Sequence, residues 1–150
     1  TKYWGPSTWF LFHTLAEKVK QDDFHHQKEK LISIIKKICS NLPCPDCKDH
    51  ATNIMKRLII SKINTKQELK MMLFLFHNSV NKRLRKREFT EKELNEQYKN
   101  KQTGIVVREF LEYWLRPNRN PKMMAQSLQK NNSSSAILSF FNENHMYYDA

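Results

Sequence analysis

The chain has 150 residues, and 26 lysines and arginines against 15 aspartates and glutamates give it a formal net charge of +11. Apolar residues make up 39% of the chain and aromatic residues 11%, which suits one domain with a hydrophobic core and argues against disorder throughout. No apolar run approaches the roughly 20 residues that cross a bilayer, and residues 1–20 lack the apolar region of a secretory signal. We therefore expect a soluble chain without a membrane span.

Glycine and cysteine usage narrows the class of protein further. The two glycines, Gly5 and Gly104, leave few tight turns for hairpins, so an all-β fold is disfavoured. They also exclude the glycine-rich phosphate loop and the dinucleotide fingerprint G-x-G-x-x-G. Three cysteines between residues 39 and 47 are too few for a secreted disulfide framework and point to local cysteine chemistry.

Apolar residues recur at helical spacing through the first 100 residues and predict five helices. The first covers about residues 6–21, and the second ends before Pro43, because proline disfavours an α conformation at the residue before it. The third begins at Cys44. The fourth spans about Thr65–Arg85 with a threonine N-cap, and the short fifth runs from Thr90 to Lys99 behind a capping box. We expect an all-α fold built on a four-helix bundle.

The pattern changes after residue 100. Residues 103–115 are predicted to form another helix that stops before Pro117. Residues 118–135 are polar, and we expect the run Asn131–Ser135 to be a flexible link. The last apolar patch, within residues 137–148, must dock on the rest of the chain or be disordered.

The segment Cys44-Pro-Asp-Cys47 carries the clearest chemical signal. Two thiols three residues apart at a helix start favour a redox disulfide, because free N–H groups and the helix dipole stabilise a thiolate there. A pair of buried, reduced cysteines is the bland alternative. A structural zinc site is the second alternative, since Cys39 and His50 complete a set of three thiolates and one imidazole.

Polar residues interrupt the most apolar helix. His77, Asn78 and Asn81 lie within one turn of each other there, and His13 stands on the apolar stripe of the first helix. Buried polar groups at such positions need partners, which are either neighbouring protein groups or the edge of a bound heterocycle.

Five cations follow within Lys82–Arg87. They are interpreted as a solvated helix end, a nucleic-acid patch or a phosphate clamp, in which Arg83 and Lys86 would hold a pyrophosphate. Phe89 is the only aromatic residue close to this run, whereas nucleic-acid binding usually interleaves several aromatics with cations.

Three motifs occur in a fixed order: W-G-P-x-x-W-x-x-x-H at Trp4–His13, P-C-x-x-C at Pro43–Cys47, and H-N-x-V-N at His77–Asn81. Together they resemble the Erv-type FAD-linked sulfhydryl oxidases, and the form L-P-C-x-x-C-x-x-H ending at His50 looks particularly like the short thiol oxidases of large cytoplasmic DNA viruses. The resemblance covers residues 3 to about 98.

The resemblance implies a helical bundle that holds FAD in residues 1–100, and leaves residues 101–150 as an extension of unknown role. It implies that Cys44 and Cys47 are catalytic. With the phosphate-clamp interpretation it gives these FAD-contacting candidates: Gly5, Trp9, His13, Cys47, His50, His77, Asn78, Asn81, Arg83, Lys86 and Tyr98. Tyr98 stands where many relatives have tryptophan, and Arg85 where glycine is frequent.

The implied activity is disulfide formation. A substrate thiolate attacks the Cys44–Cys47 disulfide at Cys44, the electrons pass through Cys47 to FAD and then to dioxygen, and hydrogen peroxide forms. The implied partners are a protein thiol or a small dithiol shuttle protein, and a second copy of the chain bound through the first two helices. The implied location is the host cytoplasm or the virion. The alternative functions are a zinc-stapled module and a basic nucleic-acid-binding module.

Overall fold

The structure is a computed structural model that describes residues 4–115 and 124–150, with the backbone alone over residues 124–133. Its helices are α1 (Trp4–Lys18), α2 (Phe24–Cys39), α3 (Pro45–Lys56), α4 (Lys66–Arg83), α5 (Glu91–Tyr98), α6 (Thr103–Trp114) and α7 (Met124–Asn144). Three short 3-10 turns, η1 (Gln21–Asp23), η2 (Ile60–Lys62) and η4 (His145–Tyr147), complete the elements. The described residues contain no strand beyond an isolated bridge between Val19 and Tyr148, so the all-α prediction is confirmed.

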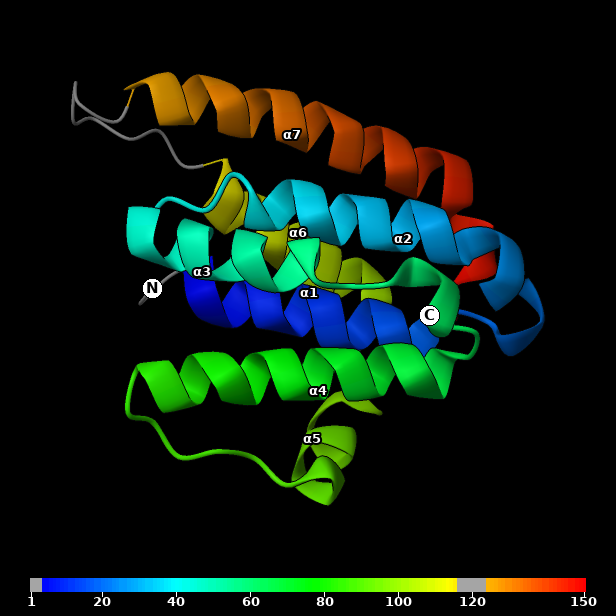
Figure 1. The fold of residues 1–150 in the computed structure, drawn as a ribbon. Coiled ribbons are helices and arrows are strands. Elements are labelled where there is room, and N and C mark those ends of the chain that lie inside the picture. The colour runs from blue at the N-terminus through cyan, green and yellow to red at the C-terminus, as the bar shows by residue number, and fades with distance from the viewer. Residues whose placement is uncertain (1–3, 116–123) are drawn as a thin grey trace.

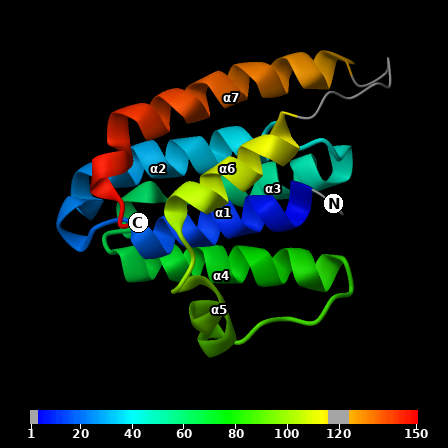
Figure 2. The same cartoon turned by 180° about the vertical axis from the view of Figure 1, so that it is seen from behind.

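Helix α1 lies at the centre of the molecule. Helices α4, α5 and α6 pack against it, while α3 and α7 pack on α2 (Figures 1 and 2). All side chains from Leu11 to Ala16 are buried, so this part of α1 has no exposed face. Within the described ranges no helix is long and apolar enough to span a membrane.

The helix starts follow local chemistry. Thr65 caps α4, with its Oγ1 accepting a hydrogen bond from the backbone N–H of Glu68 at 3.1 Å. Thr90 and Glu93 form the predicted capping box at the start of α5. Both N-cap predictions are therefore confirmed.

Helix α2 ends earlier than Pro43 requires. Its last residue is Cys39, and the side chains of the next two residues form hydrogen bonds in place of the backbone bonds of a continued helix. Ser40 Oγ and Asn41 Nδ2 both donate to the backbone oxygen of Lys37, at 3.0 and 2.7 Å. These side chains satisfy a carbonyl that the ending helix would otherwise leave open, so the helix stops before the proline acts.

The C-terminal residues complete the core. Phe110 and Trp114 of α6 are buried on the side that faces α1, and Ile137 and Phe140 of α7 are buried where α7 meets α2. A buried polar network joins the end of α7 to α2: Gln27 Nε2 donates to Asn144 Oδ1 at 3.0 Å. The apolar patch of residues 137–148 therefore docks on the bundle.

The prediction of a flexible link at Asn131–Ser135 is wrong, because this run lies inside α7. Asparagine and serine have low helix propensity, but propensity is a weak preference that packing overrides. Ser134 is only 2% exposed and stands one turn before the buried Ile137, so the docked face of α7 begins within the run. The predicted stop before Pro117 and the polar residues 118–123 lie outside the described residues.

Helix α4 ends in a turn that requires a left-handed residue. Arg85 has φ 57°, and the backbone N–H groups of Arg85 and Lys86 donate to the oxygens of Lys82 and Asn81 at 3.1 and 2.7 Å. This pairing is the Schellman ending, in which glycine is usual because a Cβ is strained at positive φ. The turn therefore keeps its shape although arginine occupies the glycine position.

The strain at Arg85 is measurable. We expect Arg85→Gly to be more stable than Arg85→Ala by about 1 kcal/mol, because both remove the charge and only glycine removes the left-handed Cβ penalty. Urea unfolding of the two variants measures the difference. Equal midpoints would contradict the left-handed turn.

Candidate functional site

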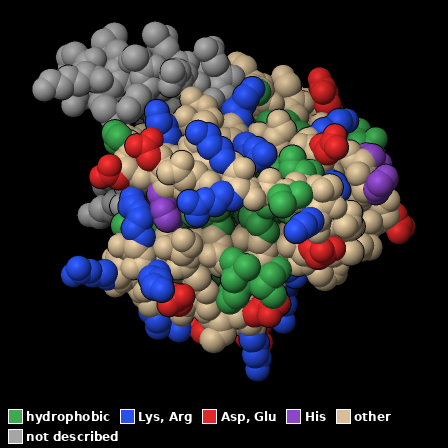
Figure 3. All heavy atoms as spheres, in the orientation of Figure 1, with side chains coloured by type: hydrophobic (Ala, Val, Ile, Leu, Met, Phe, Trp, Pro, Cys, Tyr) green, Lys and Arg blue, Asp and Glu red, His purple; other side chains and the backbone are tan. Residues whose placement is uncertain are grey.

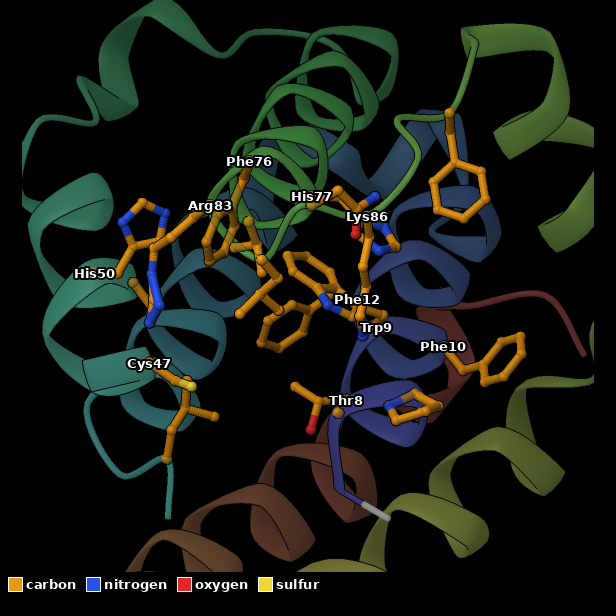
Figure 4. Close-up of a pocket in the computed structure, with 18 of the residues that line it drawn as sticks. Thr8, Trp9, Phe10, Phe12, Cys47, His50, Phe76, His77, Arg83 and Lys86 are labelled. Atoms are coloured by element: carbon orange, nitrogen blue, oxygen red, sulfur yellow. The ribbon is translucent and has the colours of Figure 1, made fainter. Parts of the chain in front are cut away.

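A cavity of about 510 Å³ opens between α1, α3, α4 and α5 (Figure 4). A pocket of this size suits an organic ligand, since such pockets typically measure about 300–1,000 Å³. It brings together residues from all three sequence motifs. Nine of the eleven candidate FAD residues line it: Gly5, Trp9, Cys47, His50, His77, Asn81, Arg83, Lys86 and Tyr98. His13 and Asn78 do not.

One wall of the cavity is aromatic. The rings of Trp9 and His77 stack with centroids 4.0 Å apart and an interplanar angle of 6°. Phe76 meets Trp9 edge-on at 4.9 Å, and Tyr98 of α5 adds a further ring. These rings come from α1, α4 and α5, so the packing of three helices creates a flat, apolar surface for a planar ligand.

His13 supports this wall from behind. Its Nε2 lies 2.9 Å from Nδ1 of His77, and its ring stacks on Tyr98 with centroids 4.6 Å apart. Burial and the neighbouring His77 lower the pKa of His13 to about 3, and burial and Lys86 lower the pKa of His77 to about 4. Both rings are therefore neutral at pH 7, and one nitrogen donates while the other accepts.

The two asparagines of α4, Asn78 and Asn81, differ in their hydrogen-bond partners. Asn78 is fully engaged with the chain: its Nδ2 donates to the backbone oxygen of Phe89 and its Oδ1 accepts from the backbone N–H of Phe89, both at 2.8 Å. This pair of bonds holds the segment after α4 against the helix. Asn81 lines the cavity, and its buried Nδ2 has no hydrogen-bond partner. A buried donor without a partner is costly, which indicates a ligand acceptor at this point.

The two cysteines stand at the start of α3. Cys44 is the N-cap residue and Pro45 follows it, so the helix begins between the two thiols. The backbone N–H of Cys47 donates to Cys44 Sγ at 3.3 Å. Both cysteines are free thiols in the structure and both are half-buried.

Cys47 is the cysteine that lines the cavity. Burial raises the pKa of the Cys47 thiol, the hydrogen bond with Cys44 raises it further, and the charge of Arg83 acts in the opposite direction. Burial and Arg83 also lower the pKa of His50. Figure 4 shows Arg83 beside His50 at the same end of the cavity as Cys47. Arg83 is therefore the cation that favours a thiolate at Cys47.

The basic run Lys82–Arg87 turns three of its five cations to the cavity. Arg83, Lys86 and Arg87 line it, with Lys86 close enough to His77 to affect its pKa. Arg87 also forms an ion pair with Glu93 at 2.6 Å. This placement fits the phosphate-clamp interpretation better than the nucleic-acid alternative.

Cys39 is 1% exposed, and burial raises its pKa to about 12. Among the residues that the structure describes, no group of three histidine, cysteine or acidic side chains is arranged to hold a metal ion. Cys39, Cys44, Cys47 and His50 are all described, so the structure does not favour the zinc-stapled alternative.

Sequence reasoning missed part of the cavity. Phe76, Val80 and Phe89 line the cavity, although none of them is among the candidate FAD residues. Their spacing carried the signal in part: Phe76 and Val80 lie on the same helix face as His77 and Asn81. A periodic stripe does not reveal whether the space beside it is filled by protein or by a ligand.

Comparison with known proteins agrees with this site. A sequence model of the Erv1 / Alr family matches residues 6–99. A protein of Invertebrate iridescent virus 3 is 28% identical over 65% of this chain and 67% of the relative, and one of Invertebrate iridescent virus 6 is 34% identical over 55% and 80%. A protein of African swine fever virus is 31% identical over 57% of this chain and 71% of the relative. All three carry the name FAD-linked sulfhydryl oxidase.

No solved structure matches the chain. The match to the family model takes in the two cysteines at the start of α3 and also His77, Asn81 and Tyr98, which the fold brings to the cavity. The chain belongs to the Erv1 / Alr family.

Proposed function

We propose that the chain is an FAD-linked sulfhydryl oxidase that forms disulfides in thiol substrates. The observation that carries the proposal is that one cysteine of the Cys44–Cys47 pair lines a cavity whose other walls are aromatic, cationic and hydrogen-bonding. The names of the viral relatives support it. In the net reaction a dithiol loses two electrons and two protons, and dioxygen takes up both as hydrogen peroxide.

The chain's residues fit FAD. Trp9 and His77 offer a flat surface for a ring system, and Asn81 Nδ2 is a buried donor that needs an acceptor. His77 uses Nδ1 toward His13 and leaves Nε2 for a ligand. Lys86 and Arg83 supply the positive charge that a pyrophosphate requires. Asn78 and His13 contribute by holding the walls, because their polar groups are engaged within the protein.

The two cysteines divide the thiol chemistry. A substrate thiolate attacks Cys44 Sγ of the oxidised pair, the Cys44–Cys47 bond breaks, and Cys47 leaves as a thiolate. A second substrate thiol then displaces Cys44, which gives the substrate disulfide and a reduced pair. Arg83 stabilises the Cys47 thiolate at the cavity. Bound FAD would supply the oxidation of the reduced pair and the transfer of its two electrons to dioxygen.

The substrate, the location, the oligomeric state and the division of the chain into two parts stay predictions. The substrate is a protein thiol or a small dithiol shuttle protein, and the viral relatives support the host cytoplasm or the virion as the location. A homodimer would need a surface other than the sides of α1 and α2 that α6 and α7 cover. We assign the oxidase site to residues 1–100, and to residues 101–150 a supporting role as part of the same core.

Replacement of either active cysteine tests the proposed function. We expect Cys44→Ser and Cys47→Ser each to abolish oxidation of dithiothreitol, measured as peroxide production, while the yellow flavin absorbance of the purified protein persists. The flavin remains because the polar groups assigned to it lie on α4 and the turn that follows it, away from the two cysteines. Cys39→Ala is the matched control: it removes a buried thiol outside the pair and should retain both turnover and flavin. Turnover comparable to that of the parent protein in either serine variant would contradict the assignment of Cys44 and Cys47 as the catalytic pair.

The same spectrum separates the alternatives. A colourless parent protein with one bound zinc would favour the zinc-stapled module, and a colourless, metal-free protein that retards DNA would favour the nucleic-acid module. A flavin band with dithiol turnover supports the oxidase.

The two asparagines of α4 provide a second test. We expect Asn81→Ala to weaken FAD binding by roughly 5- to 150-fold while the stability of the flavin-free protein is unchanged, since its Nδ2 has no protein partner to lose. Asn78→Ala should instead lower the free energy of unfolding of the flavin-free protein by about 1–3 kcal/mol, because two hydrogen bonds to Phe89 are lost. FAD titration and urea unfolding measure the two effects. Identical behaviour of the two variants would refute the distinction.

A further inference from the structure

An apolar groove separate from the cavity runs between α3 and α4. Its floor and walls include Ile54, Leu58, Met72 and the side chains of Met71 and Leu75, which are 37% and 60% exposed. In Figure 3, hydrophobic side chains gather over α3 and α4, with basic and acidic side chains at their margin. Of the eight large hydrophobic side chains that are exposed in the described residues, Met71 and Leu75 line this groove. An exposed apolar patch of this kind marks an interaction surface.

The groove is continuous with the redox site. Phe76 lines both the groove and the cavity. Ser79, which lines the groove one turn further along α4, has its Oγ 3.4 Å from Nε2 of His50, a cavity residue. Helix α3 carries the cysteines at its first turn and the groove residue Ile54 at its last. A molecule seated in the groove is therefore directed toward the thiols.

The charge around the groove selects the partner. Arg57 and Lys62 line it and have no ion-pair partner among the described residues. The acidic residue there, Glu68, has its carboxylate engaged with the backbone N–H of Asn64 and the hydroxyl of Thr65 at the start of α4. These hydrogen bonds leave the carboxylate charge in place, so the groove is apolar and its lining carries two cations against one anion. A second copy of this chain would bring a net charge of +11 and the same cations to the contact, so like charges disfavour it.

We propose that this groove binds an acidic, apolar segment of the protein whose thiols the Cys44–Cys47 pair oxidises, and this proposal rests on the proposed function. Leu75 and Met71 contact the apolar side chains of the segment, and Arg57 and Lys62 face its carboxylates. The groove supplies affinity for a protein substrate, and the exchange at Cys44 proceeds as described above. Small dithiols bypass the groove.

The length of α3 sets the distance between the reacting cysteine of such a substrate and the segment that binds the groove. Ile54 stands ten residues after Cys44, which corresponds to roughly 15 Å along a helix. An extended chain covers about 3.3–3.6 Å per residue, so a spacer of roughly five residues reaches from the reacting cysteine to the groove.

The test uses reduced synthetic peptides with the flavin-loaded protein. Each peptide carries a Cys-x-x-Cys pair and a five-residue spacer. The first ends in an apolar segment with aspartates and glutamates, the second replaces the acids by lysines, and the third replaces the apolar residues by serines. We expect kcat/KM for the first peptide to exceed the other two by about tenfold or more, and to fall with added salt because the attraction is partly electrostatic.

Two matched variants locate the effect. Leu75→Glu places a carboxylate in the groove, and Leu138→Glu makes the same change at a leucine of α7 that is 43% exposed. Leu75→Glu should lower kcat/KM for the acidic peptide about tenfold and leave dithiothreitol turnover and FAD content within about twofold. Leu138→Glu should leave all three within the same range. Arg57→Glu provides a second groove variant with the same expected result.

The outcomes separate this proposal from the proposed function. Two results would overturn the proposed role of the groove and leave the proposed oxidase function intact. One is dithiothreitol turnover without discrimination among the peptides, and the other is an equal effect of Leu75→Glu and Leu138→Glu. A parent dimer that Leu75→Glu converts to a monomer in light scattering would assign the groove to a second copy and also overturn it. Absence of dithiothreitol turnover in the parent protein would overturn both the groove proposal and the proposed oxidase function.

Discussion

The contact of α1 with α4 is the interaction on which the rest of the site depends. His13 and His77 meet there through a buried hydrogen bond between two neutral imidazoles, and Trp9 stacks on His77. Since buried polar groups must find partners, this contact sets the rotation of α1 relative to α4. That rotation places Trp9 and Asn81 on one cavity and turns Asn78 toward the segment that leads to α5.

Burial affects the ionisable groups differently at the two ends of the cavity. At the aromatic end it removes charge, because burial lowers the pKa of His13 to about 3 and that of His77 to about 4, so both imidazoles are neutral at pH 7. At the cysteine end it opposes the thiolate that the chemistry needs, and Arg83 offsets this locally. The site therefore combines two neutral imidazoles at the aromatic wall with a cation, Arg83, that acts on the Cys47 sulfur.

The C-terminal helices determine which surfaces remain open. Helix α6 supplies Phe110 and Trp114 to the core around α1, and α7 docks on α2 through Ile137 and Phe140. The family match ends at residue 99, yet side chains of both helices belong to the same hydrophobic core as α1 and α2. With α1 and α2 covered in this way, the exposed hydrophobic side chains around α4 lie on the face that also leads to the cysteines.

The sequence by itself determined α1 to α6, the N-caps of α4 and α5 and nine of the residues that line the cavity, because helix periodicity, N-caps and motif spacing are local or act between residues of one helix. It did not determine that Asn131–Ser135 continues a helix, since docking through Ile137 outweighs local propensity there. Nor did it distinguish Asn78 from Asn81, which have the same side chain three residues apart. Only the tertiary structure decided that one bonds Phe89 and the other faces the cavity, because partners for a buried amide come from segments distant in the chain.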